Sequence, residues 1–372
     1  MLIFIYTLLM LYIPSVLFLQ MRNKTIGVYE IKIKWTIALV IAFVISALIR
    51  GLAWDTGADW LVYYYFAVDA AKGYYNEWAQ HTEITFQYFV KFLADLNISD
   101  FSFFIFASAI IIYSVLRISS LYGKAQPYII VFWYLLMFIL SLNIYRQYVA
   151  MSFMMLAVWY LIHRKWKYAI ILVVLSVLFH TSSIVAIPFF VLAYFLTKKN
   201  ISVYVWIALI VATSMMTNTF LRSFLQMSSG FQNIFLMGNS NSYDVTEFAD
   251  STYGTTYIWI LMIVNSVFIY FSDKIKNRYP HYAIFHYLTV ITCILTPLCD
   301  QELLSRILLY AKMFMPITMG TSYYHYIRNK KLTNGKLAMY AVSVVYIVLF
   351  YNYLINLHET YPYMIKFDKI FI

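Results

Sequence analysis

The chain has 372 residues, of which 63% are hydrophobic and only 12% carry a charged side chain. A soluble protein of this length needs far more surface charge, so the composition indicates a membrane protein. Apolar runs of about 15 to 20 residues recur along the whole chain, which predicts helical spans and excludes a barrel of alternating strands. The net charge of +11 does not indicate a nucleic-acid partner, because lysines and arginines cluster in short loops between apolar runs.

Runs of bilayer length predict about twelve membrane-spanning helices. In chain order they are Met1–Gln20, Trp35–Ile49, Phe101–Leu121, Pro127–Leu142, Tyr148–Ile162, Tyr168–Phe179, Ile184–Thr197, Val203–Phe220, Tyr257–Phe271, Ala283–Pro297, Ile307–Tyr324 and Leu337–Leu357. The pair around His180 is expected to be two short helices with an apex at His180–Ser183. One helix over Tyr168–Thr197 would extend about 45 Å, which is too long for one crossing without heavy tilt.

The distribution of charge predicts which loops face the cytoplasm. In this scheme one side of the membrane receives 18 basic and 2 acidic residues, and the other receives 9 basic and 14 acidic residues. Such asymmetry assigns the first set to the cytoplasm and both termini to the outside. Met1–Gln20 has no basic residue before it, so it is expected to be an uncleaved first helix. We expect a single integral membrane domain over residues 1–372, with its larger loops, 50–100 and 221–256, on the outer side.

The first outer segment is too long to be a plain connector. Apolar residues at helical spacing predict two amphipathic helices along the outer interface, over Asp59–Ala71 and Thr82–Leu96. The aromatic content of 20% fits interfacial belts, and it also fits platforms on which sugar rings pack.

Two polar clusters, Asn143–Gln147 and His180–Ser183, follow apolar runs that are short for a full crossing. They are therefore expected to lie below the outer membrane surface, in a cavity that handles a charged lipid head group. Arg146 either grips a phosphate oxygen or extends to the interface and pairs with a carboxylate. His180 either exchanges a proton or hydrogen bond with a reacting group, or caps a helix end.

Further outer-side residues have the same two interpretations. Asp59 is expected at the start of one amphipathic helix and Glu83 ahead of the other, where a carboxylate serves as a cap or as a general base. Arg50 ends the second predicted span. Arg306 lies in a short outer loop with Asp300 and Glu302, where it either forms an ion pair or binds phosphate. No Cys/His cluster has zinc spacing and no nucleotide-binding loop is present, so no metal and no cofactor are expected.

These residues occur in an order that resembles a known family. The outer motif Arg50-x6-Gly57-x-Asp59-x3-Tyr63 is followed by Glu83, Arg146-Gln147, His180-Thr181 with Pro188, and Pro362-Tyr363. Together they resemble the EpsG family of Wzy-type bacterial polysaccharide polymerases, from about Ile49 to the C-terminus.

The resemblance implies an all-α, GT-C-like polytopic fold and an inverting, metal-independent glycosyltransferase in the bacterial cytoplasmic (inner) membrane. Its substrates would be undecaprenyl-pyrophosphate-linked oligosaccharides for O-antigen, capsule or exopolysaccharide. Its partners would be membrane lipid and, in the same pathway, a flippase and a chain-length regulator. The expected catalytic residues are Arg146, His180, Asp59 and Glu83. The expected substrate-binding residues are Arg50, Tyr63, Gln147, Thr181 and Arg306.

Three other functions have to be weighed against polymerisation. An O-antigen ligase would use the same donor with another acceptor. A flippase or transporter for lipid-linked sugars would show charges along a path to the cytoplasm and an internal repeat, and the sequence shows neither. A membrane O-acetyltransferase would need access to a donor from the cytoplasmic side.

Overall fold

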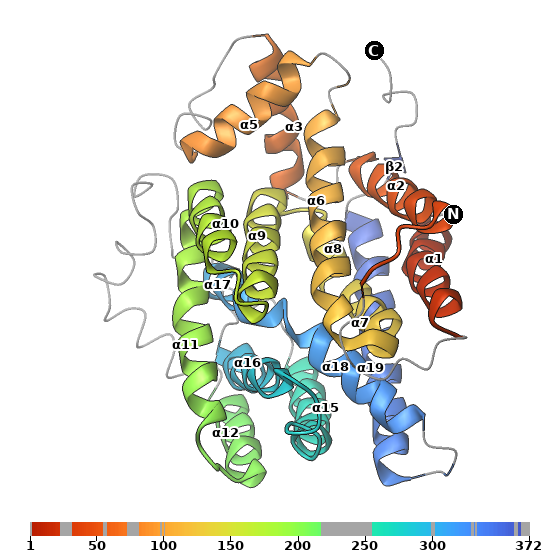
Figure 1. The fold of residues 1–372 in the computed structure, drawn as a ribbon, viewed down its shortest axis with the longest axis vertical. Coiled ribbons are helices and arrows are strands. Elements are labelled where there is room, and N and C mark those ends of the chain that lie inside the picture. The colour runs from red at the N-terminus through yellow and green to blue at the C-terminus, as the bar shows by residue number, and fades with distance from the viewer. Residues whose placement is uncertain are drawn as a thin grey trace. The chain divides into compact units, whose positions relative to one another are not determined.

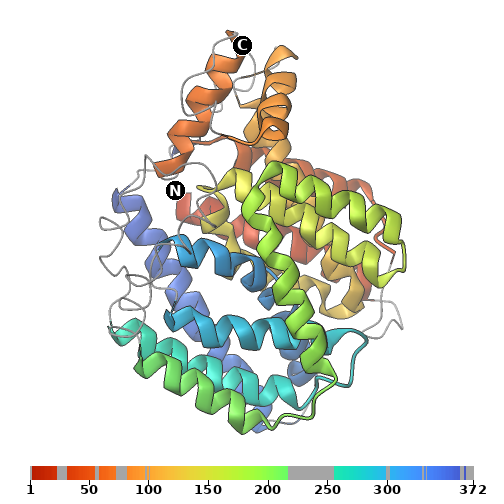
Figure 2. The same ribbon diagram turned by 90° about the vertical axis from the view of Figure 1, so that its left-hand side faces the viewer.

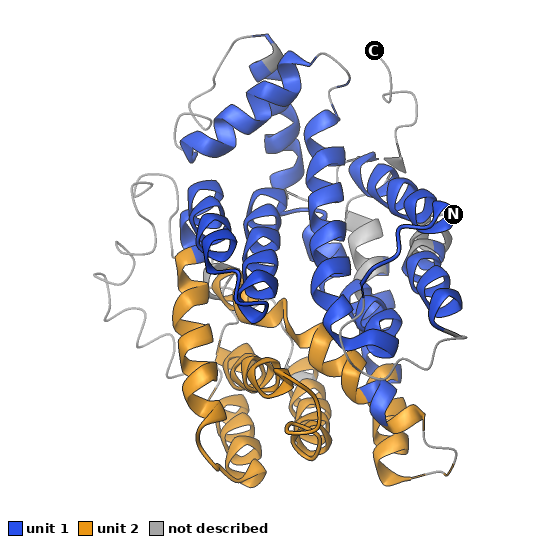
Figure 3. Ribbon diagram, viewed as in Figure 1, with its two compact units in different colours: residues 1–183, 323–325, 344–372 blue, residues 184–322, 326–343 orange. Residues whose placement is uncertain are grey.

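The computed structural model describes residues 2–22, 32–54, 58–72, 82–96, 99, 101–216, 255–298, 302–328, 331, 333–360 and 364–365. These residues are predominantly helical, with one antiparallel pair of two-residue strands (Figure 1; Figure 2 shows the view turned by 90°). Contacts divide the chain into two compact units, coloured separately in Figure 3. Unit 1 contains residues 1–183, 323–325 and 344–372, and unit 2 contains residues 184–322 and 326–343.

Unit 1 is built mainly from the first half of the chain. Its elements are α1 (Leu2–Arg22), α2 (Ile37–Gly51), β1 (Ala53–Trp54), α3 (Ala58–Ala71), α5 (Ile84–Asp95), α6 (Ser102–Ser119), η1 (Ser120–Ala125), α7 (Gln126–Trp133), η2 (Tyr134–Phe138), α8 (Ile139–Ser141), α9 (Tyr145–Ile162), α10 (Trp166–Phe179), the second part of α19 (Asn334–Thr360) and β2 (Met364–Ile365). Most of the helix bounds lie within a turn of those expected from the apolar runs. The described helices of this unit therefore follow the hydrophobic pattern of the sequence.

Residues 102–141 are helical with a kink at Gly123. Its φ is 43° and its ψ is −116°, a backbone conformation that side chains with a Cβ rarely adopt. The kink separates α6 from α7, and a π-helical turn, η2, precedes α8. The two predicted helices Phe101–Leu121 and Pro127–Leu142 are therefore both present, joined by a bent helical turn.

The two helices expected in the first outer segment are present as α3 and α5. α5 lies beyond the ends of α9 and α10 (Figure 1). The buried side of α5, with Phe86, Val90 and Leu93, packs into an aromatic core that includes Trp60 and Tyr63 of α3. Because rings from α3, α5 and α6 interlock, this core fixes the N-terminal end of α5 relative to the helices below it.

Two short helices occur on either side of His180, as the length argument predicted. α10 ends at Phe179, η3 (Thr181–Val185) follows, and α11 (Ala186–Thr197) begins at Ala186. The helix before this pair, α9, was expected to start at Tyr148, and it starts three residues earlier. α9 begins at Tyr145, so Arg146 and Gln147 lie in its first turn, where the backbone N–H groups have no hydrogen-bond partner within the helix.

Unit 2 contains the remaining apolar helices. They are α11, α12 (Val203–Met215), α15 (Thr255–Asp273), α16 (Tyr282–Leu295), η5 (Thr296–Leu298), α17 (Glu302–Lys312), α18 (Met315–Ile327) and the first part of α19. The expected extension of α12 to Phe220 and the outer loop 221–256, up to residue 254, lie outside the described residues.

One predicted span of unit 2, Ile307–Tyr324, was wrong. The helix breaks at residues 313–314, giving α17 and α18 in place of one span. Pro316 in the first turn of α18 lacks an N–H and its ring excludes a continuous helix through the preceding residues. The break places Lys312 at the C-terminal end of α17, where a cation interacts favourably with the helix dipole.

Many described helices expose apolar faces. On α2 the exposed residues Ile37, Val40, Ile41, Val44 and Ile45 form one stripe at helical spacing. Two described helical stretches have the length and composition of a membrane span, Ser102–Ser141 and Asn334–Asn352, and further apolar helices are shorter. Soluble monomers rarely expose contiguous apolar surface of this kind, whereas lipid covers it.

Candidate active site

Four of the predicted residues meet around one carboxylate, and we call Glu83, Arg146, His180 and Thr181 the Glu83 cluster. Arg146 lies 3.0 Å from Glu83 Oε2, and His180 Nδ1 lies 3.2 Å from Glu83 Oε1. The Thr181 backbone N–H and hydroxyl both donate to Glu83 Oε1, at 2.9 and 3.1 Å. The cluster therefore combines a carboxylate, a guanidinium, an imidazole and a hydroxyl, all from unit 1.

Helix ends position the members of the cluster. Glu83 immediately precedes α5, Arg146 is in the first turn of α9, and His180 follows the last residue of α10. α9 and α10 pack against each other, and the Ser176 hydroxyl donates to the Ala150 carbonyl oxygen at 2.6 Å. Residues 83, 146 and 180, far apart in the sequence, thus meet at one end of this helix pair.

Aromatic contacts support the cluster from below. The Phe179 ring packs edge-on against Phe89 of α5 and Phe153 of α9, with centroids 5.4 and 5.2 Å apart. The Arg146 guanidinium lies over the Phe86 ring at 5.7 Å. Because these rings are packed on several sides, the backbone next to His180 and the guanidinium group of Arg146 have little freedom to move.

The cluster holds Glu83 in its ionised form. Burial alone would raise the pKa of Glu83, but the His180 hydrogen bond and the charge of Arg146 outweigh it and lower the pKa to about 2. A carboxylate with so low a pKa is a weak general base at neutral pH. It is well suited to orienting the two residues that it binds.

Asp59 lies beside the start of α9. Its backbone N–H, in the first turn of α3, donates to the Asn143 side-chain oxygen at 2.9 Å. Asn143 therefore satisfies one of the N–H groups that a helix start leaves without an internal partner. The expectation that Asp59 begins a helix is confirmed, and the helix is capped from outside by Asn143.

Arg50 is fully buried. Its guanidinium donates to the Ser108 hydroxyl at 2.6 Å and to the carbonyl oxygen of Ser141, and it lies 4.6 Å from the centre of the Tyr145 ring. The Tyr145 hydroxyl donates back to the Arg50 carbonyl at 3.1 Å. These contacts tie α2, α6, α8 and α9 together, so in this structure Arg50 supports the helices that carry the cluster.

The other expected binding residues have different surroundings. Tyr63 is buried in the aromatic core, with its ring centroid 6.0 Å from that of Phe86, and Gln147 is buried in α9. Arg306 lies within α17, so the short outer loop expected over Asp300–Arg306 was wrong for this residue. Arg306 belongs to unit 2, and Gly57, Asp300 and Pro362-Tyr363 lie outside the described residues.

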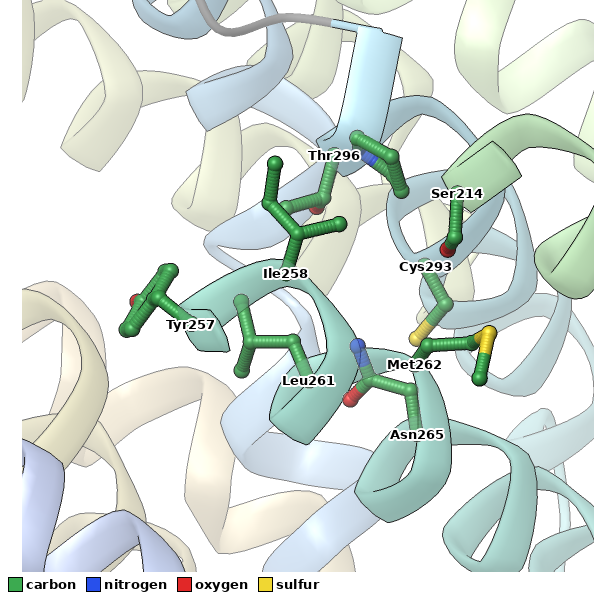
Figure 4. A pocket seen from close by; sticks show the side chains of 9 residues that line it. Ser214, Tyr257, Ile258, Leu261, Met262, Asn265, Cys293 and Thr296 are labelled. Atoms are coloured by element: carbon green, nitrogen blue, oxygen red, sulfur yellow. The ribbon is translucent and has the colours of Figure 1, made fainter. Parts of the chain in front are cut away.

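The described residues also form a small pocket in unit 2, drawn in Figure 4. The residues that line it are Ser214, Tyr257, Ile258, Leu261, Met262, Asn265, Cys293, Thr296 and Pro297. None of them is a residue that the sequence assigned to the site. The hollow expected between Arg146 and His180 stays a prediction.

A second polar cluster is buried in unit 2. The Ser272 hydroxyl lies 2.9 Å from His286 Nδ1 and 2.8 Å from the Tyr282 hydroxyl, and His286 Nε2 lies 3.4 Å from Asp273. The order Ser–His–Asp is that of a nucleophile triad, but Ser272 and His286 are completely buried and no substrate can reach them. We interpret this cluster as a support between α15, α16 and α18.

Sequence reasoning missed the partners of the predicted residues. Ser108, Ser141 and Phe179 were read only as members of apolar runs. The signal that could have found two of them is a small hydroxyl residue within such a run, because its side chain can accept a hydrogen bond from a buried arginine of a neighbouring helix.

The apolar helices and their exposed apolar faces define a helical membrane protein. The family model described as EpsG family matches residues 36–365, nearly the whole chain. The chain therefore belongs to the EpsG family, which includes Wzy-type polymerase-like proteins and indicates a membrane protein of polysaccharide biosynthesis. The resemblance noted from the sequence is confirmed. No curated protein and no solved structure matches the chain.

Proposed function

We propose that this protein polymerises undecaprenyl-pyrophosphate-linked oligosaccharide repeat units on the outer face of the cytoplasmic membrane. The observation that carries the proposal is the Glu83 cluster, which joins a guanidinium and an imidazole through one carboxylate. These are the groups that inverting glycosyl transfer needs when no metal stabilises the leaving pyrophosphate. Membership of the EpsG family supports the same reaction class.

Arg146 is proposed to stabilise the leaving group. As the bond between the anomeric carbon and the pyrophosphate oxygen breaks, negative charge develops on that oxygen. A guanidinium presents a planar set of donors to phosphate oxygens and stabilises this charge most strongly in a partly dehydrated site. The Arg146 side chain is 18% exposed, which fits such a site.

His180 is proposed to accept the proton of the attacking hydroxyl. If Glu83 accepts a hydrogen bond from Nδ1–H, as the 3.2 Å distance allows, the lone pair lies on Nε2. The acceptor sugar hydroxyl then attacks the anomeric carbon from the face opposite the pyrophosphate, and its proton passes to Nε2. The products are the extended chain and free undecaprenyl pyrophosphate, and the configuration at the anomeric carbon is inverted.

The remaining predicted residues have supporting roles in the proposal. Thr181 holds Glu83 in place through its two hydrogen bonds. Asp59, beside Asn143, is the alternative base. Arg50, Tyr63 and Gln147 support the helices around the cluster, and Arg306 is a candidate for a second phosphate-binding cation. The GT-C-like architecture, the number of about twelve spans, the single membrane domain and the pathway partners belong to this proposal as well.

The test is the length of the glycan in cells that carry Arg146→Ala or His180→Ala. Both variants should reduce polymerisation by about 100-fold or more and leave single repeat units on the lipid carrier. Lys91→Ala is the matched control, because it removes the exposed Lys91–Asp95 ion pair from α5 and should leave the ladder intact. Membrane levels of each variant are compared through an epitope tag.

Three results would contradict the proposal. Full-length chains in both variants would show that the Glu83 cluster is not the site. Loss of all surface sugar, single units included, would indicate transport. A normal ladder that fails only to reach its final acceptor would indicate a ligase.

A further inference from the structure

The lipid-facing surface of α10 leads to the Glu83 cluster. Its exposed apolar residues, Ile170, Ile171, Val174 and Leu178, are 61, 55, 49 and 45% exposed. Their spacing places them on one helix face, which we call the α10 stripe. From Ile170 to Leu178 the stripe extends about 12 Å, and it ends two residues before His180.

The same change from apolar to polar occurs on α5. Ile84, the residue after Glu83, is 62% exposed, and Tyr88 and Phe92 continue its face. α5 and α10 contact each other. Exposed apolar side chains therefore adjoin the Glu83 cluster on two of the three helices whose ends form it, α5 and α10.

This arrangement matches an anion with an apolar chain. The side chains of Arg146, Glu83 and His180 are 15 to 20% exposed, so a ligand can reach them from the surface. The guanidinium provides the charge for a phosphate, and the α10 stripe provides apolar area for a hydrocarbon chain. A free sugar phosphate has no hydrocarbon chain that could contact the α10 stripe.

The short spacing distinguishes two kinds of lipid. In a polyprenyl pyrophosphate the hydrocarbon begins at the phosphate oxygen itself. In a phospholipid a polar glycerol and two ester groups separate the phosphate from the acyl chains. Apolar residues at one and two positions from the cluster, Ile84 and Leu178, therefore fit the polyprenyl compound.

We propose that the α10 stripe binds the polyprenyl chain of the substrate whose pyrophosphate lies at the Glu83 cluster, with Ile84 and Leu178 contacting its first isoprene units. This rests on the proposed function. The substrate then reaches the cluster laterally, from the outer leaflet beside α10.

The experiment measures binding to the purified full-length protein in lipid nanodiscs. The probes are undecaprenyl pyrophosphate, farnesyl pyrophosphate and inorganic pyrophosphate. Wild-type protein should bind them in that order, tightest first. Leu178→Ser and Val174→Ser should each weaken binding of undecaprenyl pyrophosphate by about tenfold and leave that of inorganic pyrophosphate unchanged.

The matched control is Val44→Ser on α2. Val44 is 44% exposed, close to the 49% of Val174, and it lies on a helix face that the proposal does not use. This variant should bind all three probes as the wild type does. Equal weakening in Val44→Ser, or full binding in both stripe variants, would overturn the assignment of the chain to α10. Displacement of the probe by added phosphatidylglycerol would overturn the choice of a polyprenyl lipid.

The binding assay tests the path of the polyprenyl chain, and the polymerisation assay tests the proposed reaction, so the two proposals can be contradicted separately. If chain-length-dependent binding is found but Arg146→Ala cells still make full-length polysaccharide, the proposed reaction is wrong and the chain path stands. If the variants of the Glu83 cluster abolish polymer while Leu178→Ser and Val174→Ser bind normally, the chain path is wrong and the reaction stands.

Discussion

At the scale of single residues, Glu83 determines how the cluster responds to acid. Its pKa falls from about 4.5 to about 2 because His180 and Arg146 outweigh the effect of burial. A lowered pKa stabilises the fold above the ordinary pKa, and this contribution disappears as the pH falls from about 4.5 towards 2. The shift corresponds to roughly 3 kcal/mol of stability at neutral pH.

Glu83→Gln should therefore lower thermal stability in detergent at neutral pH. The difference from the wild type should shrink as the pH falls from about 4.5 towards 2, because the carboxyl group of Glu83 is then protonated in the unfolded chain while it stays ionised in the folded one. Asp95→Asn, at the exposed end of α5, is the control and should have a small effect throughout. A difference that grows at low pH would show that Glu83 is not ionised in the folded protein.

Arg50 illustrates a different role at the same scale. Arg50→Lys keeps the charge, but a single ammonium cannot reproduce the hydrogen bonds to Ser108 and Ser141. We expect a loss of about 2 to 4 kcal/mol, measured as a fall in the thermal unfolding midpoint in detergent. Arg164→Lys, in an exposed loop, should change little. Normal stability with lost polymerisation would instead indicate that Arg50 contacts the substrate.

At the scale of elements, the close approach of α2 and α6 depends on Gly51. A Cβ at this position would lie 2.6 Å from the Ile105 Cα, a backbone atom that cannot rotate away. Gly51→Ala should therefore separate the two helices and destabilise the protein by about 1 to 3 kcal/mol. Because Arg50 is the preceding residue, its bond to Ser108 of α6 should weaken too.

Thermal unfolding measures the effect of Gly51→Ala, with Val44→Ala on the exposed face of α2 as the control. Unchanged unfolding in Gly51→Ala would show that α2 and α6 are farther apart than described. A fall of similar size in Val44→Ala would show that lipid contact, rather than the approach of α6, determines the effect.

At the scale of the whole molecule, the charge asymmetry predicts that both termini lie outside. The pairing of β2 with β1 constrains the location of the C-terminal segment, because paired strands lie on the same side of the membrane. Met364–Ile365 therefore lies on the same side as Ala53–Trp54. A reporter at the C-terminus therefore reports the side on which the segment after Arg50 lies. We expect alkaline phosphatase fused at either terminus to be active and green fluorescent protein inserted at residues 163–167 to fluoresce.

Activity of alkaline phosphatase at residues 163–167 would reverse the predicted orientation. The Glu83 cluster lies at the opposite ends of α9 and α10 from this loop, so it would then face the cytoplasm. Polymerisation on the outer face would be excluded by the same result. The measurement thus tests the orientation and the proposed function together.

The sequence by itself determined the class of the protein and most of its helices. Long apolar runs have no stable location except in lipid or a core, so helix bounds follow hydrophobicity closely. Within the part of the chain that the structure describes, the expected span over Ile307–Tyr324 is broken at residues 313–314, because the effect of Pro316 competes with an otherwise continuous apolar pattern. The order of Arg50, Glu83, Arg146 and His180 also sufficed to recognise the EpsG family.

Only the tertiary structure decided which polar residues meet. Periodicity describes one helix at a time, and it contains no information on which residues of another helix lie opposite. For this reason the sequence led us to expect both Arg50 and Arg146 in contact with the substrate. Packing buries the first among serines and brings the second to a carboxylate 63 positions away in the chain. The chemistry of each arginine follows from these neighbours, because charge and burial set what a side chain can bind.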